Sequence, residues 1–242
     1  MFYLLSLLAL ALLVSSIFLA PLRSKVWVAF GFVAIAAIAV AAPSIGVLAG
    51  AEEIVLAREI PSMLGMGSLS IDPLSAIFLL IIAIAGVATM LYSHGYVGHY
   101  LTKKSSAHIS LHYTALATLI LSMMLVVMAD GGFLFLFAWE LMTIASFILI
   151  LFDAERAEVL RAALAYLIMM HVGFIFLVAG FVGLESISDD TSFSALAHCF
   201  GQGKNLAIFI LFLLGFGMKA GIFPMHVWLP EAHPAAPSHI SA

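Results

Sequence analysis

Seven long runs of apolar residues follow one another along this chain of 242 residues. Most hold roughly the 20 residues that an α-helix needs to cross a hydrocarbon core of ~30 Å. Charged residues make up only 9% of the chain, too few for a soluble domain, and the alternation of a membrane β-barrel is absent. The sequence therefore predicts an all-α, polytopic helical membrane protein with about seven transmembrane helices. The runs are 2–20, 26–48, 73–92, 111–129, 132–152, 162–184 and 206–223.

Composition excludes several other classes of protein. The formal net charge of −4 is small and spread over the connecting segments, so it favours neither a nucleic acid nor an acidic partner. The single cysteine, Cys199, excludes an internal disulfide and any multi-cysteine metal or iron–sulfur site. The first run has no basic residues before it, and Arg23 and Lys25 come after it, which predicts a retained helix rather than a signal peptide.

Three connecting segments carry structural signals of their own. The acidic segment 50–72 is predicted to hold a short surface helix. Segment 186–205 contains Asp189-Asp190-Thr191, a typical helix start, and predicts a short interfacial helix from Phe193 to Phe200. Segment 237–242 resembles the beginning of another helix with Ser238 as its N-cap, so we expect the chain to be a piece of a longer protein.

Lysine and arginine are distributed unevenly between the two ends of the runs. Six lysines and arginines follow the odd-numbered runs and two follow the even-numbered ones. Because cytoplasmic loops carry an excess of these residues, the odd-numbered runs are predicted to end in the cytoplasm. The predicted location is therefore the inner (cytoplasmic) membrane, with the N-terminus outside. The two cations are Arg58 and Lys204, and the six are Arg23, Lys25, Lys103, Lys104, Arg156 and Arg161.

Three ionisable residues fall deep inside the apolar runs, namely Glu140, His171 and Lys219. At 1.5 Å per residue, Glu140 lies ~12 Å into its helix, His171 ~14 Å and Lys219 ~20 Å. Because successive helices enter from opposite faces, all three depths fall in the middle third of a core of ~30 Å. An acid, an imidazole and an amine at one depth can exchange protons, since each changes charge with burial and with its neighbours.

This arrangement predicts Glu140 and Lys219 as a switching pair and His171 as a proton relay. Intramembrane charges usually belong to an ion pathway. Two plainer alternatives stay open: the acid and the lysine form a static ion pair that fixes helix packing, or His171 simply donates a hydrogen bond to a neighbouring helix.

The seventh run is interrupted just after its lysine. Gly217 and Gly221 loosen the helix and Pro224 cannot continue its hydrogen bonding, which predicts a helix break. The proline-rich segment that follows carries His226 and His233. These histidines are candidates for proton entry or exit at the cytoplasmic mouth of a half-channel. The alternative is that both are ordinary residues of the membrane interface.

Searches for other chemistry find no site. Four histidines beside one loop have spacings that match no zinc motif, and only one histidine is deep, which argues against a haem held by two. The sequence contains no phosphate-binding loop and no nucleophile elbow. We therefore expect no metal and no cofactor. The four histidines are His94, His99, His108 and His112.

Two motifs resemble a known family. The segment MKAGIFPMHVWLPEAHPAAPSHISA, which begins at Met218, is similar to the signature of antiporter-like subunits of respiratory complex I, Mrp cation/proton antiporters and membrane-bound hydrogenases. Trp139-Glu140-Leu141 matches the Trp-Glu-Leu of the same family. The variant PEAHPAAPSH looks most like the group of hydrogenase-4 component B and formate hydrogenlyase subunit 3.

The resemblance implies a fold of about fourteen helices with two inverted repeats of five. Residues 1–109 would supply three leading helices, and residues 110–242 an incomplete first repeat. It also implies that Glu140 and Lys219 are the proton-handling pair of the first half-channel, while His171 sits where members vary and receives no role from it.

The implied function is proton translocation as a subunit of a redox-driven complex of the hydrogenase-4/formate hydrogenlyase or NADH:quinone oxidoreductase type. Such a subunit holds no redox centre, because electron transfer occurs in a hydrogenase or dehydrogenase peripheral arm. The expected partners are that arm, other membrane-arm subunits and the lipid bilayer, with no nucleic acid. Two alternatives remain: an Mrp-like Na⁺(cation)/H⁺ antiporter subunit, and a structural scaffold of the membrane arm.

Overall fold

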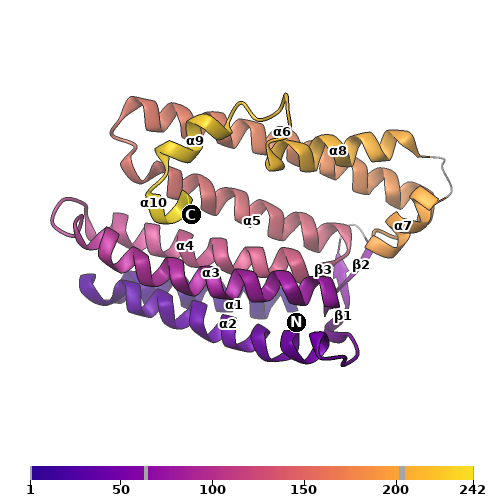
Figure 1. The fold of residues 1–242 in the computed structure, drawn as a ribbon, viewed down its shortest axis with the longest axis horizontal. Coiled ribbons are helices and arrows are strands. Elements are labelled where there is room, and N and C mark those ends of the chain that lie inside the picture. The colour runs from indigo at the N-terminus through magenta and orange to yellow at the C-terminus, as the bar shows by residue number, and fades with distance from the viewer. Residues whose placement is uncertain (1, 63–64, 202–204, 242) are drawn as a thin grey trace.

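The computed structural model describes residues 2–62, 65–201 and 205–241. Long helices run side by side in an elongated bundle, and a small antiparallel sheet closes one end (Figure 1). The long helices are α1 (Phe2–Leu19), α2 (Lys25–Leu48), α3 (Pro73–Gly98), α4 (Ser106–Met128), α5 (Gly132–Ile150), α6 (Ala157–Ser188) and α8 (Leu206–Ala220). The short helices are η1 (Leu22–Ser24), η2 (Leu151–Asp153), α7 (Phe193–Gly201), α9 (Leu229–Ala235) and α10 (Ser238–Ser241).

The helical membrane fold predicted from the apolar runs is confirmed, whereas the count of seven spans is not. Among the described residues, five helices are long and apolar enough to cross a membrane: α2, α3, α4, α5 and α6. The apolar helix α8 has only 15 residues, and the apolar part of α1 in that search runs from Ala9 to Leu19. Large hydrophobic side chains remain exposed along the outer faces of the bundle, as expected for helices that face lipid.

The connection between α2 and α3 is a β-hairpin, so the surface helix predicted for segment 50–72 is wrong. Its strands are β1 (Ile54–Ser62) and β2 (Gly65–Ile71), and the two-residue β3 (Ala129–Asp130) extends the sheet in the order β1-β2-β3. In β2 the buried positions Gly67, Leu69 and Ile71 alternate with half-buried serines. This period of two is typical of a strand with one face against a core.

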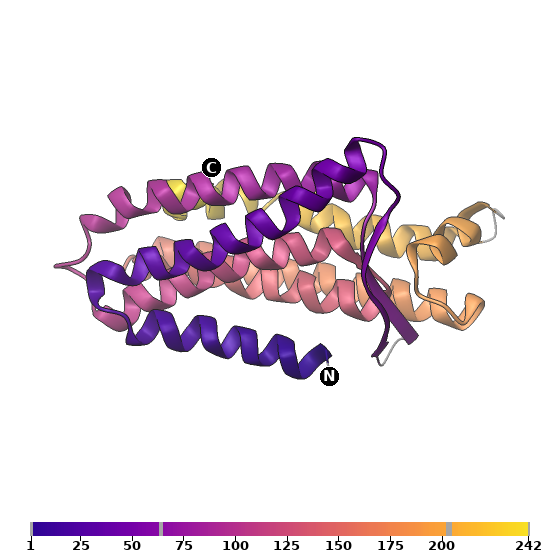
Figure 2. The ribbon, with the colours of Figure 1, turned by 90° about the horizontal axis from the view of Figure 1, so that it is seen from below.

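The sheet and α7 are joined to the start of α5. The Asp130 carboxylate accepts a hydrogen bond from the Phe193 amide at 2.9 Å, and the Gly132 amide donates to Thr191 Oγ1 at 3.1 Å. The helix predicted after Asp190 is present as α7. Figure 2 shows the sheet and α7 at one end of the bundle, and the α1–α2 and α3–α4 connections at the other.

Lys25 is a buried ionisable residue that the sequence did not mark. Lys25 is fully buried at the start of α2, and its ammonium donates to the carbonyls of Ile17 and Phe18 at 3.0 and 3.1 Å. These carbonyls belong to the last turn of α1, where no intrahelical donor is available. Lys25 therefore donates the hydrogen bonds that the last carbonyls of α1 lack. The sequence pattern had placed this lysine in a loop.

Helices α6 and α8 approach closely because glycines face each other across their contact. A Cβ atom built on Gly215 would lie 2.6 Å from the Leu177 side chain and 3.0 Å from the Gly173 carbonyl oxygen. Small residues at such positions let two helix backbones come together without a side chain between them. This contact sets the position of the last turn of α8 against α6.

The predicted break after the seventh apolar run is confirmed. Helix α8 ends at Ala220, and Gly221 takes a left-handed conformation with φ of 68°. The Ile222 amide then donates back to the Gly217 carbonyl at 3.0 Å, a C-terminal cap that glycine at this position favours. Pro224 lies beyond the helix end, in the segment that leads to α9.

Candidate functional site

Glu140 on α5 and His171 on α6 form the closest contact between the deep ionisable groups. Glu140 Oε1 lies 3.0 Å from His171 Nε2, and the two side chains are 21% and 46% exposed. His171 Nδ1 lies 2.9 Å from the Leu167 carbonyl oxygen one turn earlier. A carbonyl only accepts, so Nδ1 carries a proton.

That geometry fixes how many protons the pair holds. With Nδ1 protonated, a neutral His171 would present a lone pair on Nε2 to Glu140, and two lone pairs do not bond. The 3.0 Å contact therefore needs one proton between the carboxylate and the ring, as a histidinium beside a carboxylate or as a neutral ring beside a carboxylic acid. The contact thus needs one shared proton in addition to the proton on Nδ1.

Lys219 is held by the same turn of α5 that carries Glu140. Its ammonium donates to Thr143 Oγ1 at 2.9 Å, and the Thr143 hydroxyl donates to the Trp139 carbonyl at 3.1 Å. The ammonium also lies 4.8 Å from the centroid of the Trp139 ring, a cation–π distance. Sequence reasoning missed both Thr143 and the role of Trp139, although residues four positions apart on one helix are neighbours and can share a partner.

The direct Glu140–Lys219 contact expected from the sequence is not made. Within the described part of the chain, no ion pair of 4.0 Å or less joins the two side chains. Glu140 Oε2 is buried, and it has no hydrogen-bond partner there. The structure thus brings the acid, the imidazole and the amine together on one turn of α5, but pairs the acid with the imidazole and the amine with a hydroxyl.

The helix break positions the lysine. Lys219 is the penultimate residue of α8, where the carbonyl end of the helix favours a positive charge. Past the break the chain folds back, and Trp228 Nε1 donates to the Met218 carbonyl at 2.8 Å. The same indole packs edge-on against Tyr166 of α6, with ring centroids 5.2 Å apart.

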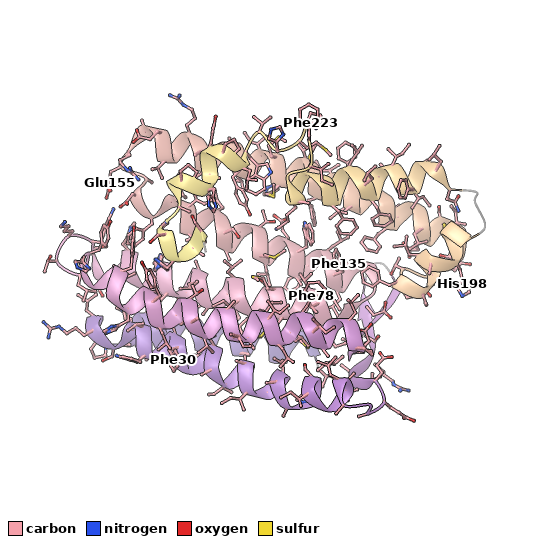
Figure 3. All side chains as sticks on the ribbon, in the orientation of Figure 1. Phe30, Phe78, Phe135, Glu155, His198 and Phe223 are labelled. Carbon is pink, nitrogen blue, oxygen red and sulfur yellow. The ribbon has the colours of Figure 1, made fainter. Side chains whose placement is uncertain are left out.

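His226 and His233 are not joined to these three groups. His226 is half-buried with its Nδ1 unpartnered in the described structure, and its ring lies 5.6 Å from that of Phe223, which is 82% exposed. His233 is exposed on α9, and its carbonyl accepts from Ser241 Oγ. Figure 3 shows Phe223 on the outer edge of the bundle. A part for these histidines in proton entry or exit stays a prediction.

An ionic contact ties the α3–α4 loop to the α5–α6 connection, at the end of the bundle opposite the sheet. Lys104 Nζ donates to both carboxylate oxygens of Glu155 at 2.6 and 2.7 Å, and lies 3.3 Å from Asp153. Burial alone would lower the pKa of Lys104, but its carboxylate partners outweigh burial and raise it. The same hydrogen bond lowers the pKa of Glu155.

No group of three or more histidine, cysteine, aspartate or glutamate side chains with metal-binding geometry occurs among the described residues. The arrangement supports proton and charge transfer by the side chains themselves.

Comparison with known proteins shows which proteins this chain resembles. Residues 129–242 match the family model described as NADH:quinone oxidoreductase/Mrp antiporter, TM. Hydrogenase-4 component B of Escherichia coli (strain K12) is 35% identical over 178 residues, which are 72% of this chain and 25% of that protein. The protein named as antiporter subunit mnhA2 of Staphylococcus aureus (strain MRSA252) is 32% identical over 178 residues, 72% of this chain and 22% of its own.

An uncharacterized protein of Mycobacterium tuberculosis (strain ATCC 25618 / H37Rv) is 39% identical over 176 residues, again 72% of this chain and 26% of the relative. The chain therefore spans about a quarter of the length of these relatives.

Two solved structures share the fold. The membrane-bound sulfane sulfur reductase, an archaeal respiratory membrane complex, superposes with a TM-score of 0.79 at 17% identity, over 97% of this chain and 47% of that chain. The Mrp complex from Dietzia sp. DQ12-45-1b gives a TM-score of 0.75 at 24% identity, over 97% and 25%. At these identities the likeness shows the fold alone. The family resemblance expected from the two motifs is confirmed.

Proposed function

Because residues 129–242 belong to the transmembrane family of NADH:quinone oxidoreductase and Mrp antiporter subunits, we propose that the chain is part of a proton-translocating membrane subunit. The observation that carries the proposal is the turn of α5 at residues 139–143. It holds a one-proton Glu140–His171 pair and, beside it, the ammonium of Lys219 on Thr143.

The site has two charge arrangements that differ by one proton. When the Glu140–His171 pair keeps its proton, Lys219 stays on Thr143, as in the structure. When the pair loses its proton, Glu140 becomes an uncompensated carboxylate and attracts the ammonium toward its free Oε2. Two unit charges 4 Å apart attract by about 4 kcal/mol at an effective dielectric constant of 20, which exceeds a typical neutral hydrogen bond.

The cycle follows from those two arrangements. Loss of the proton moves Lys219 from Thr143 to Glu140, and return of a proton to Glu140 or His171 releases it to Thr143. A distant event that moves α8, or a charge brought near α5, would bias the lysine and so drive the proton.

We assign this activity to a subunit of a redox-driven complex of the hydrogenase-4 or NADH:quinone oxidoreductase type, with electron transfer in partner subunits. The relative named hydrogenase-4 component B supports this assignment. The relative named as antiporter subunit mnhA2 supports the second candidate, a cation/proton antiporter subunit. In both cases the partners are other membrane subunits, and the chain needs no redox cofactor of its own.

The test uses the full-length protein, in its complex, in inverted membrane vesicles with a pH-sensitive dye. Proton uptake after adding an electron donor supports the redox-driven assignment. Uptake that responds to added Na⁺ without a donor supports the antiporter instead. Glu140→Gln and Lys219→Ala are expected to abolish uptake while the complex still assembles, because each removes one side of the charge exchange.

Matched controls are available on exposed positions of the same chain. Glu158→Gln and Lys103→Ala make the same chemical changes at exposed sites and are expected to transport at the wild-type rate. Wild-type transport in both Glu140→Gln and Lys219→Ala would refute the proposal. Retained transport in a Glu140→Leu/Lys219→Leu double variant would assign the charges a packing role, as in a structural scaffold.

A further inference from the structure

Two buried histidines meet at a second place in the bundle, away from Glu140. His112 on α4 is 3% exposed and His239 on α10 is 2% exposed, and their Nε2 atoms lie 3.0 Å apart. The Phe152 ring packs against His112 with centroids 4.7 Å apart, and the Tyr96 ring against His239 at 4.8 Å. His239 lies at the end of the signature segment and His112 outside it, and the site described above uses neither ring.

The pair must share one proton. Two imidazole nitrogens at 3.0 Å are bonded only when one donates and the other accepts. The Nδ1 atoms of both rings are buried and have no hydrogen-bond partner in the described structure. In the neutral pair, one ring therefore carries a proton on Nδ1 and the other presents a bare Nδ1, and the two rings can exchange these roles.

Titratable groups from α3 and α4 surround the pair. They are Tyr92 and Tyr96 from α3, and Tyr113 and His108 from α4. Within the described residues, no ion pair of 4.0 Å or less reaches either ring. If the two rings only packed α4 against α10, apolar side chains would give a more stable contact, because buried polar atoms without partners are destabilising.

Polar groups lead from the bundle end to His108, one helical turn before His112, and the apolar Phe152 ring packs against both histidines. Glu155 is exposed at that end (Figure 3) and bonds to Lys104. His108 is half-buried, and its Nε2 contacts the Phe152 carbonyl at 3.0 Å. The Phe152 ring then lies between the rings of His108, at 5.2 Å, and His112.

We propose that the His112–His239 pair is a second proton-transfer site, which passes protons between the Lys104–Glu155 end of the bundle and its interior. The inference deepens the proposed function and rests on it. A proton binds the bare Nδ1 of His112, the Nε2 proton of His112 moves to Nε2 of His239, and His239 releases its Nδ1 proton. One proton enters and one leaves, and the rings then turn before the next transfer.

The experiment measures proton uptake by the full-length protein in inverted vesicles with His112→Gln and His239→Gln. A glutamine amide can still form hydrogen bonds, but it cannot take a proton at one atom and release another elsewhere. We expect uptake to fall roughly 100-fold or more in each variant, the range that a lost proton-transfer group causes, and the double variant to be no worse than either single one. His99→Gln, an exposed change just past the end of α3, is the control and is expected to behave as wild type.

A His112→Leu/His239→Leu variant separates transfer from packing, because an apolar pair restores the contact without carrying protons. Proton transfer predicts that this variant assembles and does not transport. Wild-type uptake in it, or in either glutamine variant, would overturn the inference. Loss of the assembled complex in step with loss of uptake would also overturn it, since it would assign the rings a packing role.

Failure of the proposed function would look different. Wild-type uptake in Glu140→Gln together with loss in His239→Gln would refute the role of Glu140 and leave the histidine pair in place. A readout that needs no transport is the ¹⁵N correlation between the two Nε2 atoms through their shared proton, in histidine-labelled full-length protein in lipid. Its presence in wild type and its loss in His112→Gln are expected, and its absence from wild type would refute the shared proton.

Discussion

Replacing Thr143 by valine tests whether the hydroxyl that holds Lys219 is part of the transfer cycle. Valine keeps the shape of threonine and removes the Oγ1 atom to which the ammonium donates at 2.9 Å. Thr143 is fully buried, so no bulk water reaches its side chain to take over the contact. A hydrogen bond to a charged group contributes about 1.5–3 kcal/mol, so this change should favour the arrangement with Lys219 on Glu140 by roughly 10- to 150-fold.

The expected result is a slower cycle rather than a misfolded protein. Lys219 must leave Glu140 before the carboxylate can be protonated again, and without Thr143 it has no polar acceptor to move to. We expect the maximal rate of proton uptake in vesicles to fall about tenfold or more, within the range set by that free energy. Thr143→Ser keeps the hydroxyl and should retain most of the rate.

A double-mutant cycle makes the test sharper. If Thr143 acts through Lys219, then adding Thr143→Val to Lys219→Ala should cause no further loss, because the partner is already gone. Equal rates for wild type, Thr143→Val and Thr143→Ser would refute the reasoning. A loss in Thr143→Val that adds fully to that of Lys219→Ala would show that the hydroxyl acts elsewhere.

Three further predictions concern neighbouring features. His171→Gln should abolish the proton held against the carboxylate and slow uptake roughly 100-fold, the lower range for a lost acid–base group, with the pH dependence of uptake flattened relative to wild type. Gly215→Val should lower stability by about 1–3 kcal/mol, measured as a lower unfolding temperature, because its side chain must force α6 and α8 apart; Gly183→Ala, which meets only ordinary contacts, should not. Lys104→Met should make the α3–α4 loop more sensitive to protease, with the full effect between about pH 4.5 and 10.5 and a fading effect below and above this range. The reason is that the lowered pKa of Glu155 stabilises the contact above its ordinary value of 4.5 until acid protonates it, and the raised pKa of Lys104 stabilises it below 10.5 until base removes the proton.

The sequence predicts the long elements well and the short ones unevenly. Runs of apolar residues are a strong signal for membrane helices, and Gly221, two residues after Lys219, correctly marks the end of α8. The hairpin at residues 54–71 was missed because β2 is built from glycine and serine, whose alternation with Leu69 and Ile71 is short and weak. Neither residue propensity nor charge predicts this hairpin, because the strand is stabilised by its contact with the bundle.

Depth along a helix could be predicted from sequence, but the partners of each side chain could not. The rise per residue places Glu140, His171 and Lys219 together, which the structure supports. Which of them touch depends on how each helix is rotated about its axis, and the sequence does not state that rotation. The pairing of His112 with His239 is harder still, because 127 residues separate them and only the fold past the break brings them together.

The arrangement on α5 also explains why a lysine near the end of a broken helix suits transport. A cation that moves between two acceptors on one helical turn needs only its own flexible side chain to move, since neighbours on a turn lie about 5–6 Å apart. The backbone of α5 and the glycine contact between α6 and α8 can then stay fixed while the charge shifts. If the lysine had only Glu140 as a partner, each proton arriving there would leave an ammonium without any acceptor in an apolar bundle. Thr143 removes that penalty, which makes it the residue on which the two-arrangement cycle depends.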